Sequence, residues 1–128
     1  MKIFKNFIIS PKYFNSIILI GNFDGLHLGH QKLFKKAREF KKKYKIKIGI
    51  ITFNPIPKMF FNKKIKNFKL MNINQKIEQF KKQKVDFLIN QNFSKRFSKI
   101  KANIFIKKYL NKKIKTRFLF VSNNFRFG

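Results

Sequence analysis

Residues 16–30 read SIILIGNFDGLHLGH, and this stretch decides how the chain folds. The β-branched apolar run over Ser16–Asn22 ends in turn residues, which predicts a buried strand. From about His30 the apolar residues take helical spacing, with lysines filling the other face. The stretch also holds both histidines, three of the five glycines and one of the four acidic residues of the chain. A strand end followed by a helix start is a usual place for phosphate binding.

The rest of the chain continues the alternation of strand and helix. Further strands are predicted over Ile46–Phe53, Val85–Asn90 and Thr116–Ser122. Helices are predicted from about His30 to Tyr44, over Asn74–Lys84 and over Ala102–Asn111, the last with Phe105/Tyr109 and Ile106/Leu110 spaced four apart. The prolines after Asn54 end the second strand, and a long basic loop reaching about Asn72 is expected near a site. This order predicts an α/β fold with a parallel sheet and right-handed crossovers.

Length and composition set further bounds on the protein. A chain of 128 residues is enough for one domain and one core. The absence of Cys excludes disulfides and cysteine metal sites, and favours a reducing cytoplasm. The apolar run Ile17–Ile20 is far too short for a membrane span, and Lys5 interrupts the N-terminal segment, so neither a membrane partner nor a signal peptide is expected.

The net charge of +28 suggests a nucleic-acid binder at first sight. The lysines are, however, spread along the whole chain, and the enriched Lys, Phe, Ile and Asn all have A/T-rich codons. We therefore attribute the charge to genome composition and expect no specific nucleic-acid partner. The many positive charges of the folded protein still repel one another, so an anionic ligand such as a nucleotide is expected to stabilise it.

The pattern HLGH after a strand fits the binding of phosphate groups. Gly25 and Gly29 allow a tight turn and a close approach to a ligand, and the helix that follows presents its N–H groups and dipole. His27 and His30 lie three residues apart, on one side of the helix start, and can donate hydrogen bonds to phosphate oxygens. Preorganised donors of this kind supply much of the catalysis in phosphoryl and nucleotidyl transfer.

Two other interpretations of the histidines stay open. In the first, the two histidines are metal ligands assisted by Asp24, although no further His or Cys exists to complete the set of ligands. Alternatively, they are structural residues at a helix cap. We favour the phosphate site because the glycines, the strand end and the helix start coincide there.

These residues resemble a known family. The sequence Gly21–Gln31 is similar to the opening motif of the bacterial FAD synthases, the FMN adenylyltransferase module of bifunctional riboflavin kinase/FMN adenylyltransferases. Three later blocks also look like motifs of this family, in the same order: TFNPIP at 52–57, FSKRFSKI at 93–100 followed by FI at 105–106, and VSNNFRFG at 121–128. The resemblance covers residues 16 to 128.

The resemblance implies a Rossmann-like nucleotidyltransferase fold and the reaction of ATP and FMN to FAD and pyrophosphate, with Mg²⁺. It implies the following roles for residues of this chain. The catalytic residues are His27 and His30, which stabilise the ATP phosphates and the transition state. The nucleotide is bound by Gly21, Asn22, Phe23, Asp24 and Gly29. The flavin and ATP cleft is shaped by Pro55, Pro57, Asn124 and Phe125. Asp24 orients the turn or a metal-bound water, and an Asx turn is an equal alternative for it.

The chain also departs from the family's pattern. Ile56 stands where the family often has His, Ser122 replaces the usual Gly, and Asn124 replaces the usual Asp. A second phosphate motif, Ser-Ser-Thr-x-x-Arg, would lie after Gly128, as would the riboflavin kinase domain. We thus expect residues 1–128 to form an adenylyltransferase domain that is incomplete at its C-terminus, with no kinase domain. A missing Arg removes a charge clamp on the leaving pyrophosphate.

The leading hypothesis is therefore an FMN adenylyltransferase module. A catalytically impaired remnant, another nucleotidyltransferase with the His-x-Gly-His site and a different acceptor, and a non-catalytic basic protein that binds nucleotides or nucleic acid are the alternatives. The last would bind any polyanion with a steep dependence on salt and without a need for His27.

Overall fold

A parallel five-stranded sheet forms the centre of the computed structural model, which describes residues 1–23, 28–54 and 73–122. Its strands are β1 (Lys2–Phe4), β2 (Ile17–Ile20), β3 (Ile48–Asn54), β4 (Phe87–Asn92) and β5 (Phe118–Val121), in the order β1-β4-β3-β2-β5. The helices are α1 (Leu28–Tyr44), α3 (Ile73–Lys82), α4 (Lys95–Ser98) and α5 (Ala102–Ile104), with a short 3₁₀ turn, η1 (Pro11–Tyr13), and a last helical segment, η2 (Phe105–Lys113). The predicted α/β architecture is confirmed.

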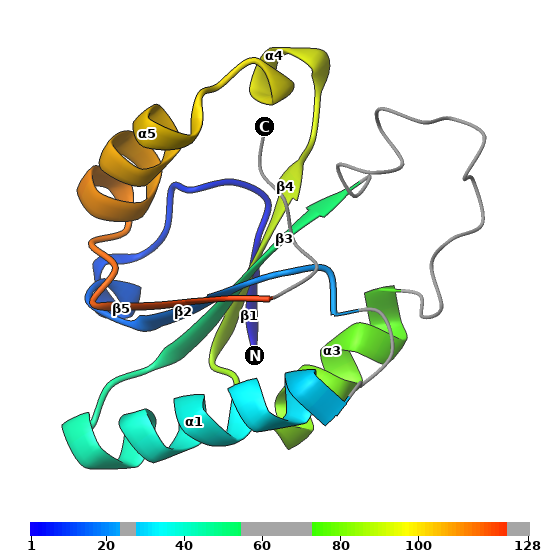
Figure 1. Cartoon of the computed structure of the whole chain (residues 1–128), viewed down its shortest axis with the longest axis vertical. Coiled ribbons are helices and arrows are strands. Elements are labelled where there is room, and N and C mark those ends of the chain that lie inside the picture. Colours follow the sequence, from blue (N-terminus) through cyan, green and yellow to red (C-terminus); the bar gives the residue numbers. More distant parts are fainter. Residues whose placement is uncertain (24–27, 55–72, 123–128) are drawn as a thin grey trace.

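Helices cover both faces of the sheet (Figure 1). Side chains alternate along a strand, so Ile17 and Leu19 of β2 face one layer while Ile18 and Ile20 face the other. The first layer is made by α1 and α3, which contribute Phe34 and Phe80. The second is made by the N-terminal segment, α4, α5 and η2. All four residues of β2 are buried, as the continuous apolar run predicts.

Three elements lie outside the sequence prediction: β1, η1 and α4. β1 has three residues and pairs with β4 at the sheet edge, so its pattern is too short to give a periodic signal. In α4 the Ser94 side chain accepts a hydrogen bond from the Phe97 N–H, which caps a helix of four residues. Phe97 of this short helix enters the core.

The last predicted helix differs from an α-helix in its hydrogen-bond spacing. Residues 105–113 form π-helical turns, in which the bond spans five residues instead of four. Phe105 and Leu110, five residues apart, are both buried, whereas Ile106 is 53% exposed. Spacing by five explains why Ile106 and Leu110 do not share the buried face. The Phe105 and Tyr109 rings do stack, with centroids 5.8 Å apart.

Asp86 joins three elements just before β4. Its Oδ2 accepts hydrogen bonds from the Ile48 N–H at 2.8 Å and from Lys41 Nζ at 2.9 Å. The same Lys41 Nζ donates to the Lys84 carbonyl at 2.9 Å. One carboxylate thus connects α1, β3 and the turn before β4.

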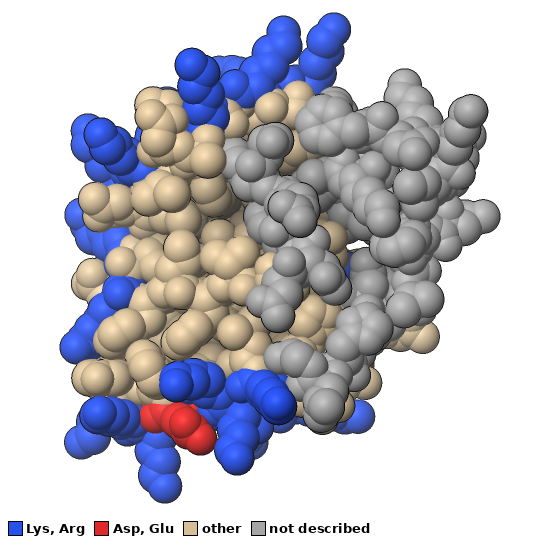
Figure 2. Space-filling model, in the orientation of Figure 1, with Lys and Arg blue, Asp and Glu red and all other residues tan. Residues whose placement is uncertain are grey.

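Figure 2 shows how charge is distributed on one face of the molecule. Over the described residues of the face in Figure 2, Lys and Arg lie along the border and uncharged residues fill the middle. This face therefore carries no single basic block, in agreement with the spread of lysines along the sequence.

Gly49 of β3 lies directly opposite Phe87 of β4, and a Cβ at position 49 would overlap the Phe87 ring. We expect Gly49→Ala to lower the free energy of unfolding by about 1–3 kcal/mol because the packed ring has to move. In urea unfolding, the double variant Gly49→Ala/Phe87→Leu should lose less than the two single losses added together. Strict additivity would contradict a direct clash.

Asp86→Ala should cost about 1–3 kcal/mol of stability because the buried Ile48 N–H loses its side-chain acceptor. Asp86→Asn should cost less, since its amide oxygen can still accept that bond. Glu78→Ala is the matched control: its ion pair with Lys81 is exposed and 3.5 Å long, so a change within about 0.5 kcal/mol is expected. Equal losses for Asp86→Ala and Glu78→Ala would show that the bond to Ile48 is unimportant.

Candidate nucleotide site at the end of β2

The end of β2 lies beside the end of β5, and this pairing builds the candidate site. Ile20 is in register with Val121, so the next residues, Gly21 and Ser122, are neighbours. The Ser122 N–H donates to the Ile20 carbonyl at 2.9 Å, and the Gly21 N–H donates to the Ile51 carbonyl of β3 at 3.3 Å. Backbone hydrogen bonds therefore fix both residues at the carboxyl edge of the sheet, where ligands of open α/β sheets bind.

Gly21 has no room for a side chain. A Cβ there would lie 2.8 Å from Ser122 Cβ and 3.0 Å from the Phe23 ring. The first distance is shorter than real Cβ contacts, and the second is tighter than most of them. Glycine is therefore required for the close approach of β2, β5 and the turn that follows β2.

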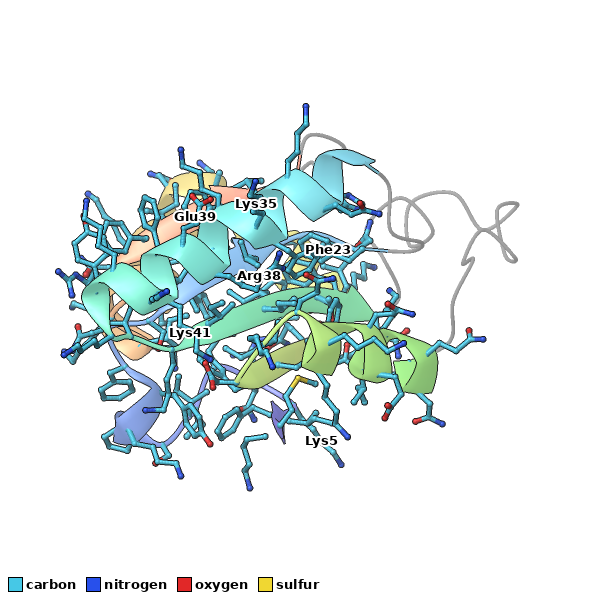
Figure 3. All side chains as sticks on the ribbon, turned by 90° about the horizontal axis from the view of Figure 1, so that it is seen from below. Lys5, Phe23, Lys35, Arg38, Glu39 and Lys41 are labelled. Atoms are coloured by element: carbon cyan, nitrogen blue, oxygen red, sulfur yellow. The ribbon has the colours of Figure 1, made fainter. Side chains whose placement is uncertain are left out.

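Phe23 holds the turn between β2 and α1 in place. Its backbone has a φ of 54°, in the left-handed region that costs an L-residue about 1–2 kcal/mol. The ring is 1% exposed and packs against Phe34 of α1 and Phe80 of α3, with centroids 5.3 and 6.0 Å away. Figure 3 shows Phe23 between α1 and the sheet. Burial of this ring offsets the backbone strain and anchors the segment that leads into the site.

His30 lies in the first turn of α1 and makes contacts with both neighbouring segments. Its Nε2 is 3.2 Å from the Oγ of Ser122, a residue 92 positions later in the chain. Its ring makes an edge-to-face contact with the Phe23 ring, with centroids 5.1 Å apart and planes at 66°. The structure thus brings together Gly21, Phe23 and His30 of the predicted site and adds Ser122. The sequence singles out Ser122 only as a departure from the family's glycine and gives no sign of this contact.

Asn22 adds an unused hydrogen-bonding group to the same place. Its side-chain oxygen Oδ1 is buried and has no hydrogen-bond partner among the described residues. A buried polar atom without a partner costs free energy, and a ligand donor such as a hydroxyl or an amino group would satisfy it.

The first turn of α1 supplies a positive electrostatic potential. α1 has 17 residues, and Gly29 lies in its first turn. The first N–H groups of such a helix have no partner within the helix, and the helix dipole favours an anion at this end. The His30 imidazole, the N-terminal end of α1 and the Asn22 amide oxygen together fit a phosphate ester that also carries a polar group.

Several predicted site residues lie outside the described residues: His27, Asp24, Pro55, Pro57, Asn124 and Phe125. Their placement stays a prediction. Within the described parts of the chain, no three His, Cys, Asp or Glu residues gather as a set of metal ligands.

A separate surface pocket of about 330 Å³ lies between the N-terminal segment, the end of β4, α4 and η2. Its lining includes Phe7, Phe97 and Tyr109 together with the cationic Arg96 and Lys113. Among the residues that the structure describes, none of those predicted to form the nucleotide site lines it.

Comparisons with known proteins agree with the resemblance found in the sequence. Bifunctional riboflavin kinase/FMN adenylyltransferases are 40% identical over 114 residues in Buchnera aphidicola subsp. Schizaphis graminum and 31% identical over 112 residues in Escherichia coli strain K12. These alignments cover 89% and 88% of this chain and 36% of each relative, so the chain spans about a third of their length.

A solved structure shares the fold. It is titled as a macrolide-efflux protein from Streptococcus pneumoniae, and it superposes with a TM-score of 0.82 at 28% identity, over 98% of this chain and 42% of that one. In the described part of this chain, no helix has the length and apolar character needed to cross a membrane. Residues 10–128 match the family model described as FAD synthetase, and the chain therefore belongs to the FAD synthetase family.

Proposed function

We propose that this chain carries the site for adenylyl transfer from ATP to FMN, which gives FAD and pyrophosphate. The observation that carries the proposal is the placement of His30 in the first turn of α1, held by Ser122 and Phe23 at the carboxyl edge of the sheet. Membership of the FAD synthetase family and the names of the relatives support this choice of reaction.

The chemistry requires orientation and charge stabilisation more than covalent help. An oxygen of the FMN phosphate attacks the α-phosphorus of ATP. The bond from this phosphorus to the oxygen between the α- and β-phosphorus atoms breaks, and that oxygen leaves with the electron pair as part of pyrophosphate. His30, together with His27, would donate hydrogen bonds to the phosphate oxygens as negative charge grows on them. The N-terminus of α1 would add its dipole to this stabilisation.

The remaining roles follow from the same arrangement. Gly21 and Gly29 would let the triphosphate approach the backbone, and the buried amide oxygen of Asn22 would accept a hydrogen bond from the nucleoside. Pro55, Pro57, Asn124 and Phe125 would shape the flavin side of the cleft, with Asp24 supporting the turn. Magnesium belongs to the MgATP substrate in this proposal, and we place the reaction in the cytoplasm.

His30→Ala is expected to abolish FAD formation while leaving the fold intact, because His30 is only part-buried in the first turn of α1. The measurement is HPLC of FAD from ATP, Mg²⁺ and FMN, with circular dichroism to check folding. Lys35→Ala, at an exposed position on the same helix, is the matched control and should keep its activity.

Near-normal turnover by His30→Ala would overturn the role of this residue. If the wild-type chain forms no FAD and is stabilised by neither ATP nor FMN, the proposed function fails. Salt-sensitive binding of any polyanion, unchanged in His30→Ala, would then identify the charge alone as the cause of binding.

Gly21→Ala should lower the free energy of unfolding by about 1–3 kcal/mol and reduce the thermal stabilisation by ATP, since the new Cβ meets Ser122 and Phe23. Adding Ser122→Gly removes one of the two clashes and should recover part of the stability, measured by denaturant unfolding. No recovery would show that the Phe23 ring alone excludes a side chain at position 21.

A further inference from the structure

We propose that Ser122 is a positioning residue that holds the His30 imidazole in its working orientation before the triphosphate binds. The proposal deepens the proposed function and rests on it. The direct observation is the contact of 3.2 Å between Ser122 Oγ and His30 Nε2, which links the end of β5 to the start of α1.

Ser122 is itself fixed, as a positioning residue has to be. Its N–H donates to the Ile20 carbonyl at 2.9 Å. Ser122 directly follows Val121, the residue of β5 that pairs with Ile20 of β2. The residue is 6% exposed, and its Cβ lies against Gly21. The backbone of Ser122 is thus held in place, and its hydroxyl can move mainly by rotation about the Cα–Cβ bond.

The His30 ring is contacted on two sides. Ser122 contacts its Nε2, and the buried ring of Phe23 lies edge-to-face with it, with the ring planes at 66°. A hydrogen bond restricts rotation of the ring, while an aromatic contact sets its tilt. With both in place, the ring needs little reorganisation when charge develops on a nearby phosphate, and such preorganisation accelerates the chemical step.

A hydroxyl suits this position because it both donates and accepts. It can donate to an unprotonated Nε2 and accept from a protonated one. Ser122 therefore keeps its contact whichever nitrogen of His30 carries the proton. An alanine there would keep the packing and lose this contact.

The test compares Ser122→Ala, Ser122→Thr and the wild-type chain by steady-state kinetics of FAD formation and by ¹⁵N NMR of the imidazoles. The protein has two histidines, so His27→Asn assigns their resonances. We expect Ser122→Ala to lower kcat about fivefold with little change in KM for ATP, and to move the His30 Nε2 resonance. Ser122→Thr, which keeps the hydroxyl, should restore both.

Ser16→Ala is the matched control. Ser16 is a buried serine whose Oγ donates to the Tyr13 carbonyl at 2.7 Å, at the opposite end of β2. It should reduce stability without moving the His30 resonance or kcat. The inference is overturned if Ser122→Ala leaves the Nε2 resonance and kcat unchanged, or if Ser16→Ala changes them as much.

The two proposals fail in distinguishable ways. If the wild-type chain forms no FAD and is stabilised by neither ATP nor FMN, the proposed function is overturned and the catalytic part of this inference falls with it, while the resonance shift still reports the contact. If the wild type and Ser122→Ala form FAD equally fast, the function stands and the positioning role is wrong.

Discussion

The register between β2 and β5 is the constraint on which the candidate site depends. These strands are far apart in sequence, and pairing of Ile20 with Val121 is what brings Gly21 beside Ser122. A slip by one residue would turn the side chains of β5 to the opposite face of the sheet. Phe118 and Phe120 would then leave the layer formed by α1, where both pack against Phe40. Packing far from the site therefore enforces the contact between Ser122 and His30.

Close packing at this junction also explains the unusual backbone that follows β2. The Phe23 ring and Ser122 leave little space for a Cβ at Gly21, and Phe23 itself has a positive φ. The buried Phe23 ring then supports both α1 and α3 through Phe34 and Phe80. Local strain and core packing are coupled here, because the same ring that compensates the strain also meets His30.

Sequence patterns predicted the fold wherever one signal extends over many residues. The apolar runs around Ile17–Ile20 and Ile48–Ile51 gave the central strands, and the periodicity up to Tyr44 gave α1. Helix ends were harder because glycine is scarce: Lys45, Lys84 and Lys115 adopt the left-handed conformation that usually marks a glycine after a helix. The Ser122–His30 contact spans 92 residues, and nothing local in the sequence encodes it. The glycines and histidines of the site were recognisable since their chemistry is local, whereas their partners depend on sheet register.

The large positive charge acts on the association of an anionic ligand, whereas the short-range contacts of the site act on its selection and on the chemical step. A net charge of +28 attracts any polyanion and speeds its encounter with the protein. This attraction weakens as salt is added, and it does not distinguish one phosphate ester from another. Selection requires groups at fixed positions. Under the proposed function these are the amide oxygen of Asn22 and the imidazole of His30, which the Ser122 hydroxyl contacts. Because Gly21 and Phe23 hold these groups through packing rather than through charge, salt should weaken association without loosening the geometry that chemistry needs.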